Sequence, residues 1–301
     1  MEQYNFFAKV VSNNETTHET NTVSVLTEKR ERLTLRIEKA VKLQLNAVYY
    51  FETTPIVFNE KDQFLINAYE SIDQKPLELE ERQALMTCFY EYAPLTISEI
   101  KEIVESYLAK IENQVIKEIV MAVYEKRKEA FYLYPAATKL HHAYISGLSF
   151  HTSTMLKLID GFIKNYSFLN EDLLIAGIFL HDICKVEELS SYAGPEYSKK
   201  GKLLGHITMG VKALEVTALQ LGYEDKEETL LLQHMILSHH YYGNYGSPKK
   251  PNLPEALILH FIDNIDSKMT ALEAALKITE EGEFTQPVTV LDRERYYKAK
   301  K

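Results

Sequence analysis

The chain has 301 residues, 46% of them hydrophobic, which excludes an intrinsically disordered protein and allows two domains of ordinary size. Its net charge is −9, from 34 basic and 43 acidic side chains, and this excludes a protein that coats nucleic acid through bulk positive charge. No apolar run approaches the roughly 18 residues of a membrane helix, so we expect neither export nor membrane anchoring.

The two cysteines, Cys88 and Cys184, lie far apart in the sequence. Their number and spacing predict neither a disulfide framework nor a zinc knuckle. We therefore expect a reducing, cytoplasmic setting.

Residues 1–75 predict a small OB-like β-barrel, in which polar turns separate short strands. In the third strand Leu33 and Leu35 alternate with Arg32 and Arg36, so we expect both arginines in solvent, as candidate substrate-binding residues. A basic barrel face is a platform for single-stranded nucleic acid, and the alternative is a solvated face on a barrel used for assembly. The strands are expected over Phe6–Val11, Thr22–Leu26, Arg32–Glu38, Val48–Val57 and Gln63–Tyr69.

Residues 76–135 predict a helical connector, because the hydrophobic period changes after Pro76. The second of its helices begins with Thr96-Ile97-Ser98-Glu99, a capping-box pattern. The helices are expected over Leu77–Tyr92, Ser98–Leu108 and Gln114–Tyr132.

Residues 136–282 predict an all-helical bundle, followed by a net basic C-terminal tail over residues 283–301 that contacts substrate, a neighbouring subunit or neither. The whole chain is therefore expected to be a multi-domain α+β protein. A bundle that supplies side chains from several helices suits an enclosed metal centre. The helices are expected over His142 to Asn165 with a break at Gly147, Asn170 to His181, Leu204 to Leu221, Lys226 to His239, and Pro254 to Thr279.

Histidines gather in the bundle: only His18 precedes residue 141, and the other nine fall between residues 141 and 260. The pair His181-Asp182 ends an apolar run, and an adjacent imidazole and carboxylate can bind one divalent ion while the carboxylate bridges to a second. Two antiparallel helices could bring His151 to this pair. Asp263 lies within an otherwise apolar helix face, where a carboxylate needs a partner such as a metal.

The order H…HD…H…HH…D, across roughly residues 140–270, resembles the HD-domain metallophosphohydrolase superfamily. Further motifs, together with the OB-like N-terminal segment, resemble the YhaM-type 3'-to-5' exoribonucleases over nearly the whole chain. These motifs are Leu140-His141-His142-Ala143, Gly147-Leu148-Ser149-Phe150-His151-Thr152, Gly205-His206-Ile207, Ser238-His239-His240 and Tyr245-Gly246-Ser247-Pro248.

The resemblance implies a site with two divalent ions and catalytic roles for Asp182 and Lys185, the latter near the scissile phosphate. Ligation by histidine and carboxylate without thiolate favours Mn²⁺, with Fe²⁺ or another divalent ion as the alternative. The ligands implied for the first ion are His151, His181, Asp182 and Asp263, and those completing the second beside Asp182 are His206, His239 and His240.

Two positions depart from the family pattern. Cys184 stands where members often have glycine after the His-Asp-Ile sequence, and Ser146-Gly147 stands where Gly-Gly is frequent. The bulk of Cys184 at a tight position is expected to affect efficiency more than ligation.

Five further side chains near the motifs divide into two groups. For His141 and His142 the resemblance favours a role near the site, and the alternative is an ordinary hydrogen-bonded or surface histidine. His234 and His260 are expected to be ordinary structural histidines, and Asp266 a cap or a surface ion-pair partner.

Lysines and tyrosines flank the implied ligands in sequence. No arginine occurs between Arg127 and Arg293, so phosphate contacts would come from the ions and from lysines, which grip a backbone without reading bases. The tyrosines would either stack on bases at the mouth of the site or pack on their own helix ends. The candidate substrate-binding residues here are Lys199, Lys200, Lys202, Tyr241, Tyr242, Tyr245, Lys249 and Lys250.

The sequence thus predicts a divalent-metal-dependent 3'-to-5' exoribonuclease that releases 5'-mononucleotides from single-stranded RNA, with single-stranded DNA as a secondary substrate and homo-oligomerisation left open. One alternative is an HD-domain phosphohydrolase acting on free nucleotides. The other is a non-catalytic factor in which the barrel binds nucleic acid and the helical domain is a scaffold. An exonuclease yields a ladder of products, the phosphohydrolase prefers mononucleotides, and the binding factor shows no turnover.

Overall fold

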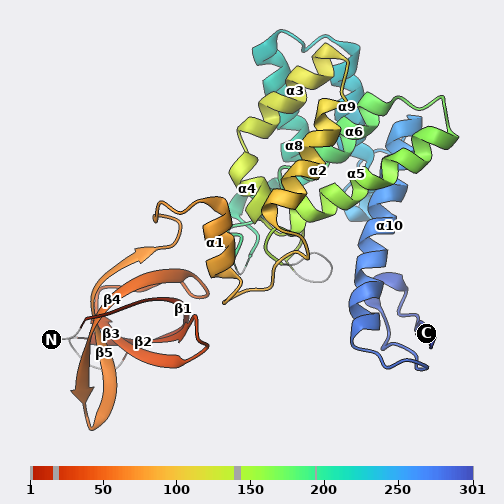
Figure 1. Cartoon of the computed structure of the whole chain (residues 1–301). Helices are drawn as coiled ribbons and strands as arrows, with labels where there is room; N and C mark the ends of the chain where they lie inside the picture. Colours follow the sequence, from red (N-terminus) through yellow and green to blue (C-terminus); the bar gives the residue numbers. More distant parts are fainter. Residues whose placement is uncertain (1–2, 16–19, 139–143, 194, 301) are drawn as a thin grey trace. The chain divides into compact units, whose positions relative to one another are not determined.

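The computed structural model describes residues 3–15, 20–138, 144–193 and 195–300, and the chain divides into two compact units, Met1–Tyr92 and Ala93–Lys301 (Figure 1). His141 and His142 lie outside the described residues. None of the helices in the described part of the chain is long and apolar enough to cross a membrane. The predicted division into segments ending at residues 75, 135 and 282 stays a prediction.

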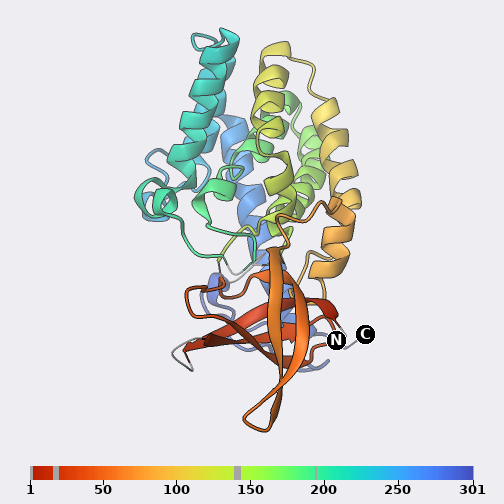
Figure 2. The same ribbon diagram turned by 90° about the vertical axis from the view of Figure 1, so that its left-hand side faces the viewer.

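The first unit is built on five strands that close into a barrel in the order β1-β2-β3-β5-β4 (Figure 2). Strand β3 pairs with β5 in parallel, and all other neighbouring strands pair antiparallel. Every predicted strand is present, and the third has the predicted bounds. The strands are β1 (Tyr4–Glu15), β2 (Thr20–Thr27), β3 (Arg32–Glu38), β4 (Val48–Phe58) and β5 (Lys61–Ser71), followed by helix α1 (Leu79–Met86).

Alternating side chains fill the barrel interior, as the period-2 pattern of the strands requires. They come from four strands and from the loop before β4, so the core forms only when the barrel closes. The core residues are Ala8, Val10, Val23, Val25, Leu35, Ile37, Leu43 and Phe51.

Arg36 is buried, and the expectation that it lies in solvent beside Arg32 is wrong. Only 5% of Arg36 is exposed, whereas Arg32 is exposed. The Arg36 guanidinium donates to Gln63 Oε1 and Thr20 Oγ1, both at 2.7 Å, and lies 3.4 Å from the centre of the Phe58 ring. Side chains from β2, β4 and β5 thus cover the arginine and accept two of its hydrogen bonds, so the basic group is part of the packing of the barrel.

The second unit is a helical bundle completed by a C-terminal segment (Figure 1). Its helices form where the apolar periodicity predicts them, with different ends. They are α2 (Ile97–Ala109), α3 (Gln114–Glu125), α4 (Lys128–Leu133), α5 (Gly147–Asn165), α6 (Glu171–Leu180), α7 (Lys185–Glu188), α8 (Lys199–Leu221), α9 (Glu227–Ser238), η1 (Gly243–Tyr245), α10 (Pro254–Lys277) and η2 (Thr289–Leu291).

Helix α6 forms the centre of the bundle. All its side chains from Leu173 to Leu180 are buried, and it packs against α2, α3, α5, α9 and α10, as expected of a helix that is apolar on every face. At Gly177 a Cβ atom would collide with the end of the Met235 side chain of α9. The glycine therefore allows α6 and α9 to approach closely.

Two predicted helices are altered by single residues. The helix predicted over Gln114–Tyr132 is two helices, because Arg127 leaves the helical region with φ −130° and ψ 2°. Helix α8 begins at Lys199 rather than Leu204, since the Ser198 side chain caps it, and a kink at Gly205, with φ 72°, lies inside it. The four-residue helix α7 was too short to predict.

The other helix ends are closer to expectation. The Thr96 capping box is confirmed, with Glu99 bonded to the Thr96 backbone N–H at 2.8 Å. Helix α1 ends at Met86, well before the predicted Tyr92. Helix α5 begins at the predicted break, Gly147, so the described part of the chain has no helix before it from residue 144.

Aromatic rings fix α3 and α4 on the central helix. The Phe179 ring of α6 lies 5.3 Å, centroid to centroid, from the rings of both Tyr124 and Phe131. The hydroxyls of Tyr124 and Tyr132 share a buried 2.8 Å hydrogen bond. The cluster therefore combines ring packing with a satisfied polar pair.

Replacing Phe179 by alanine is expected to destabilise the helical unit by about 3–5 kcal/mol, because it leaves a cavity among rings that cannot collapse. The measurement is urea denaturation followed by circular dichroism at the helical wavelength. Phe168→Ala is the matched control: this ring is 70% exposed, so its removal should change the unfolding free energy by no more than about 0.5 kcal/mol. Equal losses for the two variants would contradict the central role of α6.

Candidate metal centre

The ligands that the family resemblance implied lie inside helices or directly after helix ends. Those after helix ends are, in each case, the C-cap residue and the residue that follows it. They are His151 in α5, His181 and Asp182 after α6, His206 in α8 just past the Gly205 kink, His239 and His240 after α9, and Asp263 in α10.

Two groups of these side chains converge closely enough for each to hold an ion. Within each group the nitrogen or oxygen atoms all lie within 4.8 Å of one another. Imidazole and carboxylate are the donor set expected for Mn²⁺, Fe²⁺ or Zn²⁺. The first group is His151, His181 and Asp263, and the second is His206, His239 and His240.

Asp182 lies between the two groups. Its Oδ2 atom is 3.3 Å from His181 Nε2, and its Oδ1 atom is 3.2 Å from His206 Nε2 and 3.9 Å from His239 Nε2. Lys185 Nζ lies 2.6 Å from Oδ2. One carboxylate thus reaches both groups, which is the arrangement that a bridging ligand requires.

Several buried polar atoms at this centre have no hydrogen bond within the described part of the chain. Burying such an atom without a partner costs about 1–3 kcal/mol, so a cluster of them is expected only where a ligand satisfies it. All of them face the same small region. They are His181 Nε2, Asp182 Oδ1, His206 Nε2 and His239 Nε2. These side chains fit divalent cations.

Backbone carbonyls orient two of the imidazoles. His181 Nδ1 lies 2.6 Å from the carbonyl oxygen of Ile178, and His239 Nδ1 lies 2.7 Å from that of Ile236. A carbonyl oxygen only accepts, so Nδ1 carries the proton and donates in both cases. The lone pair of each ring is therefore on Nε2, at the centre.

Carboxylates orient the other two imidazoles, and both carboxylates were missed in the sequence. His151 Nδ1 lies 2.6 Å from Asp266 Oδ2, and His206 Nδ1 lies 3.0 Å from Glu188 Oε1. Asp266 is 8% exposed, so the expectation of a surface position is wrong. Asp266 lies three residues after Asp263, so both acids lie on one helix face. This spacing in the sequence indicated that Asp266 is close to the ligand Asp263. Glu188 carried no such signal, because His206 is distant in sequence.

The contacts of His151 shift the pKa of its imidazole. Burial lowers this pKa, but the bonds to Asp263 and Asp266 outweigh burial and raise it to about 10. Burial raises the pKa of Asp263, yet the bond to His151 holds it well below its usual range. Without an ion, a proton on His151 balances the two carboxylates. An ion held by these residues would take the place of that proton.

Burial and neighbouring charges also shift the pKa values of Asp182 and His239. Burial opposes ionisation of Asp182, but the nearby Lys185 and His181 hold its pKa well below the usual range. Burial and the neighbouring His240 lower the pKa of His239 far below that of a free imidazole. His239 is therefore neutral, as a metal ligand must be.

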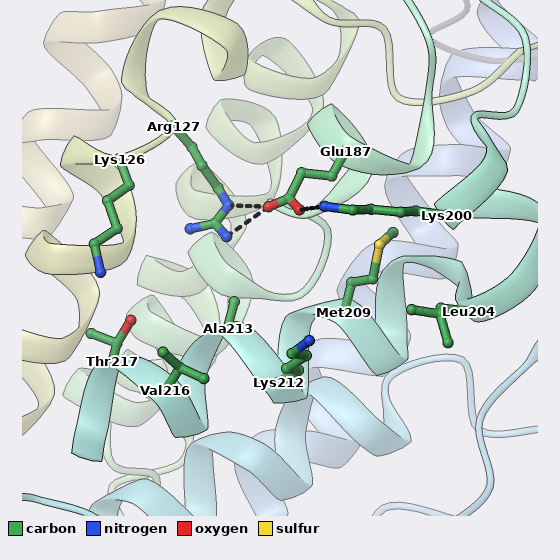
Figure 3. Close-up of a pocket in the computed structure, with 10 residues that line it drawn as sticks. All are labelled: Lys126, Arg127, Glu187, Lys200, Leu204, Met209, Lys212, Ala213, Val216 and Thr217. Atoms are coloured by element: carbon green, nitrogen blue, oxygen red, sulfur yellow. Dashed lines mark hydrogen bonds and ion pairs between the residues drawn. The ribbon is translucent and has the colours of Figure 1, made fainter. Parts of the chain in front are cut away.

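Ion pairs hold α7, the short helix that carries Lys185 and Glu188. Figure 3 shows Arg127 and Lys200 reaching its half-buried residue Glu187 from opposite sides. Arg127 Nη2 lies 2.7 Å and Lys200 Nζ 3.6 Å from the Glu187 carboxylate, across a surface cavity of about 220 Å³. The helix break at Arg127 thus contributes to positioning α7.

Comparison with protein families matches residues 149–268 to the HD domain. The chain is 43% identical over 210 residues to the 3'-5' exoribonuclease YhaM of Geobacillus sp. (strain WCH70) and 42% identical over 210 residues to that of Bacillus subtilis (strain 168). These matches cover 70% of this chain, and 64% and 67% of the respective relatives. The chain belongs to the YhaM family. A match to YhaM of Halalkalibacterium halodurans, 41% identical over 216 residues, covers 72% of this chain and 67% of the relative. The chain thus spans about two thirds of the length of these relatives.

The two departures from the YhaM-family pattern have different consequences. Ser146 has φ 64°, in the left-handed region that favours glycine, so the frequent glycine at this position has a backbone reason. Cys184 is buried, and burial raises the pKa of its thiol to about 11. The thiol is therefore protonated and packs as a small apolar group.

The tyrosines and lysines of the loop after α9 lie in different surroundings. Tyr242 lines a cavity of about 430 Å³ together with His240 and Asp263. Lys250 Nζ lies 5.1 Å from the centre of the Tyr241 ring. The structure does not bring Lys249 to the ligands: it lines a separate cavity beside His234. Of Tyr245 only the backbone is described, in η1.

The remaining residues are three lysines at the start of α8 and two histidines. Lys199, Lys200 and Lys202 all lie in the first turn of α8, and Lys200 is paired with Glu187. His234 accepts the backbone N–H of Asn252 at 2.8 Å, and His260 donates to the carbonyl of His239 at 2.8 Å. These two histidines have structural partners, as expected.

Asp266→Asn is expected to weaken Mn²⁺ binding at the first group about 10- to 100-fold, because His151 loses the charged partner that fixes its ring. Glu188→Gln should have the same effect at the second group through His206. Free Mn²⁺ can be counted by electron paramagnetic resonance during titration, which needs no turnover.

Asp225→Asn is the matched control, since Asp225 is an exposed acid on the turn between α8 and α9. Its Mn²⁺ titration should equal that of the wild type. If Asp266→Asn and Glu188→Gln also bind Mn²⁺ as the wild type does, the two carboxylates do not support the ligands.

Proposed function

We propose that this chain is a divalent-metal-dependent 3'-to-5' exoribonuclease that removes 5'-mononucleotides from single-stranded RNA. The observation that carries the proposal is the convergence of two ligand groups on Asp182 in a member of the YhaM family. The relatives named above are 3'-5' exoribonucleases. Single-stranded DNA is proposed as a secondary substrate, and the cytoplasm as the compartment.

The first ion would be held by His151, His181 and Asp263, the second by His206, His239 and His240, and Asp182 would serve both. Bound divalent ions would activate water and neutralise charge on the scissile phosphate. We propose Mn²⁺ for both positions, with Fe²⁺ as the alternative, because the donors are imidazole and carboxylate without thiolate.

Lys185 is proposed to act next to the reacting phosphate. Although burial lowers the pKa of Lys185, the Asp182 carboxylate outweighs that effect and raises it, so the side chain is an ammonium ion. At 2.6 Å from Asp182 Oδ2 this ammonium fixes the rotation of the carboxylate. It also adds positive charge where a phosphodiester must approach several acidic groups.

The barrel is proposed to be an OB-like platform for the RNA strand. Its five strands close with the order β1-β2-β3-β5-β4, and small closed barrels of this kind bind oligonucleotides on one face. Tyr4 and Tyr69 are exposed large aromatic side chains on it, suited to stacking on bases, and Arg32 is an exposed cation. Such local contacts would supply affinity in a chain whose net charge is negative.

The decisive test uses 5'-labelled single-stranded RNA with Mn²⁺, comparing the wild type with Asp182→Asn on a denaturing gel. The wild type should shorten the strand progressively. The variant should lose more than about 100-fold in rate, because removing only the partner of a ligand already costs about 10- to 100-fold. A chelator should abolish the ladder, and added Mn²⁺ should restore it.

Asp225→Asn serves again as the control and should degrade RNA as the wild type does. An intact oligomer beside a hydrolysed mononucleotide would instead identify a nucleotide phosphohydrolase. Binding of RNA without turnover in any metal would identify a non-catalytic factor.

Arg32→Ala is expected to weaken RNA binding at the barrel and to reduce the slope of log affinity against log salt concentration by about 0.7, the value for one lost phosphate contact on a single strand. Fluorescence anisotropy in the Asp182→Asn background measures this without degradation. Arg36→Ala is the contrasting variant: it should lower the melting temperature by removing a buried, bonded cation. A wild-type salt slope in Arg32→Ala would rule out this face as the RNA platform.

A further inference from the structure

The cavity beside the ligands has room for more than a phosphate. Its volume of about 430 Å³ falls within the range of about 300–1,000 Å³ typical of sites for small molecules. His240 and Asp263, one from each ligand group, lie in its wall. A molecule in this cavity would therefore lie next to the reacting phosphate.

The same wall carries polar side chains that are not needed to hold ions. Asn264 and Lys268 come from α10, and Asp292 follows η2 in the C-terminal segment. Within the described residues, no hydrogen bond or ion pair engages these three side chains. Their donors and acceptors are available to a ligand.

The C-terminal segment is fixed on α10, so Asp292 has a defined place. Lys298 Nζ donates to the carbonyl oxygens of Leu276 at 2.9 Å and Thr279 at 2.7 Å, which caps the end of α10. The backbone N–H of Thr285 donates to Tyr296 at 2.9 Å across the segment. What the sequence indicated as a tail is therefore folded, and it forms part of the cavity wall.

Asp292 lies in a turn whose backbone is in the left-handed region. Its φ is 54°, and that of the next residue, Arg293, is 62°. Asn59 and Glu60, in the turn between β4 and β5, form a similar pair of left-handed residues. The turn at Asp292 places an exposed acid in the cavity wall.

A carboxylate near a phosphate-binding centre is unfavourable unless it meets a hydrogen-bond donor. On a nucleotide the ribose hydroxyls are such donors, and an acidic residue commonly accepts from the 2'-hydroxyl in nucleotide sites. Tyr242, in the same wall, offers a ring on which a base can stack. Lys268 supplies a cation for the phosphate.

We propose that this cavity binds the 3'-terminal ribonucleotide of the RNA, with Asp292 accepting hydrogen bonds from its 2'- and 3'-hydroxyl groups. The assignment rests on the proposed exoribonuclease function and deepens it. Asp292 is a specificity-determining residue, which selects strands that end in an unmodified ribose. A 3'-phosphate would set a second anion against Asp292, so such ends resist degradation.

The test compares cleavage of two RNA oligomers that differ only in the 2'-hydroxyl of the last nucleotide. The wild type should favour the ribose end about ten-fold, as one hydrogen bond to a charged acceptor gives. Asp292→Gly should abolish that preference, because it removes the acceptor while glycine keeps the left-handed backbone. Since both oligomers carry the same phosphates, general losses of RNA affinity cancel in the ratio.

Arg293→Gly is the matched control, with the same substitution at the adjacent left-handed residue. It should keep the ten-fold preference. This result would show that the effect of Asp292→Gly comes from loss of the carboxylate and not from the backbone freedom that glycine adds. Asp292→Asn keeps an acceptor oxygen without the charge, and it should degrade 3'-phosphate ends faster than the wild type does. An unchanged preference for the ribose end in Asp292→Gly overturns the assignment.

Binding without turnover separates this assignment from the proposed activity. Calorimetric titration of the full chain should show tighter binding of adenosine 5'-monophosphate than of its 2'-deoxy form, and Asp292→Gly should equalise them. If the binding preference is present but RNA is not shortened, the activity fails and the nucleotide site stands. If RNA is shortened with no 2'-hydroxyl preference in either measurement, the role of Asp292 alone fails.

Discussion

The arrangement of the helical unit depends on a buried carboxylate. Asp182 is 3% exposed, and an ionised group there is tolerated only when other charges surround it. Lys185 compensates it directly, at 2.6 Å. The histidines around it belong to separate helices, so the bundle must close before the charge is balanced. The balance is incomplete within the protein, since Oδ1 has no hydrogen bond among the described residues.

The C-terminal ends of α6 and α9 orient a histidine ring in the same way. At the C-terminus of a helix the last carbonyls lack partners within the helix. His181 follows α6 and His239 follows α9, and each donates Nδ1–H to a carbonyl three residues earlier. Each ring then presents Nε2 beyond the end of its helix. The next residue in each case, Asp182 or His240, is also an implied ligand, so each helix end supplies two adjacent ligands.

Local patterns predicted much of the fold from the sequence. The five strands followed from polar turns and alternation, and the capping box at Thr96 followed from spacing. Features set by distant partners were beyond such patterns. Arg36 alternates correctly with its neighbours, yet Gln63 and Phe58 cover it. Arg127, at the helix break, likewise bonds to Glu187, sixty residues further along the chain.

The site shows the same limit. The family resemblance named the imidazoles and acids that converge, because their order along the chain is distinctive. It did not name Glu188, whose role depends on the Gly205 kink bringing His206 to it. The acid Asp292 was equally hidden, since no pattern in a basic tail predicts that it folds back on α10.

The close approach of α6 and α9 at Gly177 has a consequence for how this centre can evolve. His181 follows one of these helices and His239 the other, so a contact in the hydrophobic interior joins the two elements that carry these ligands. A methyl group added at Gly177 would meet the end of the flexible Met235 side chain, which would have to repack while every ligand stayed in place. Residues that bind no ion can thus change the packing that carries the ligands.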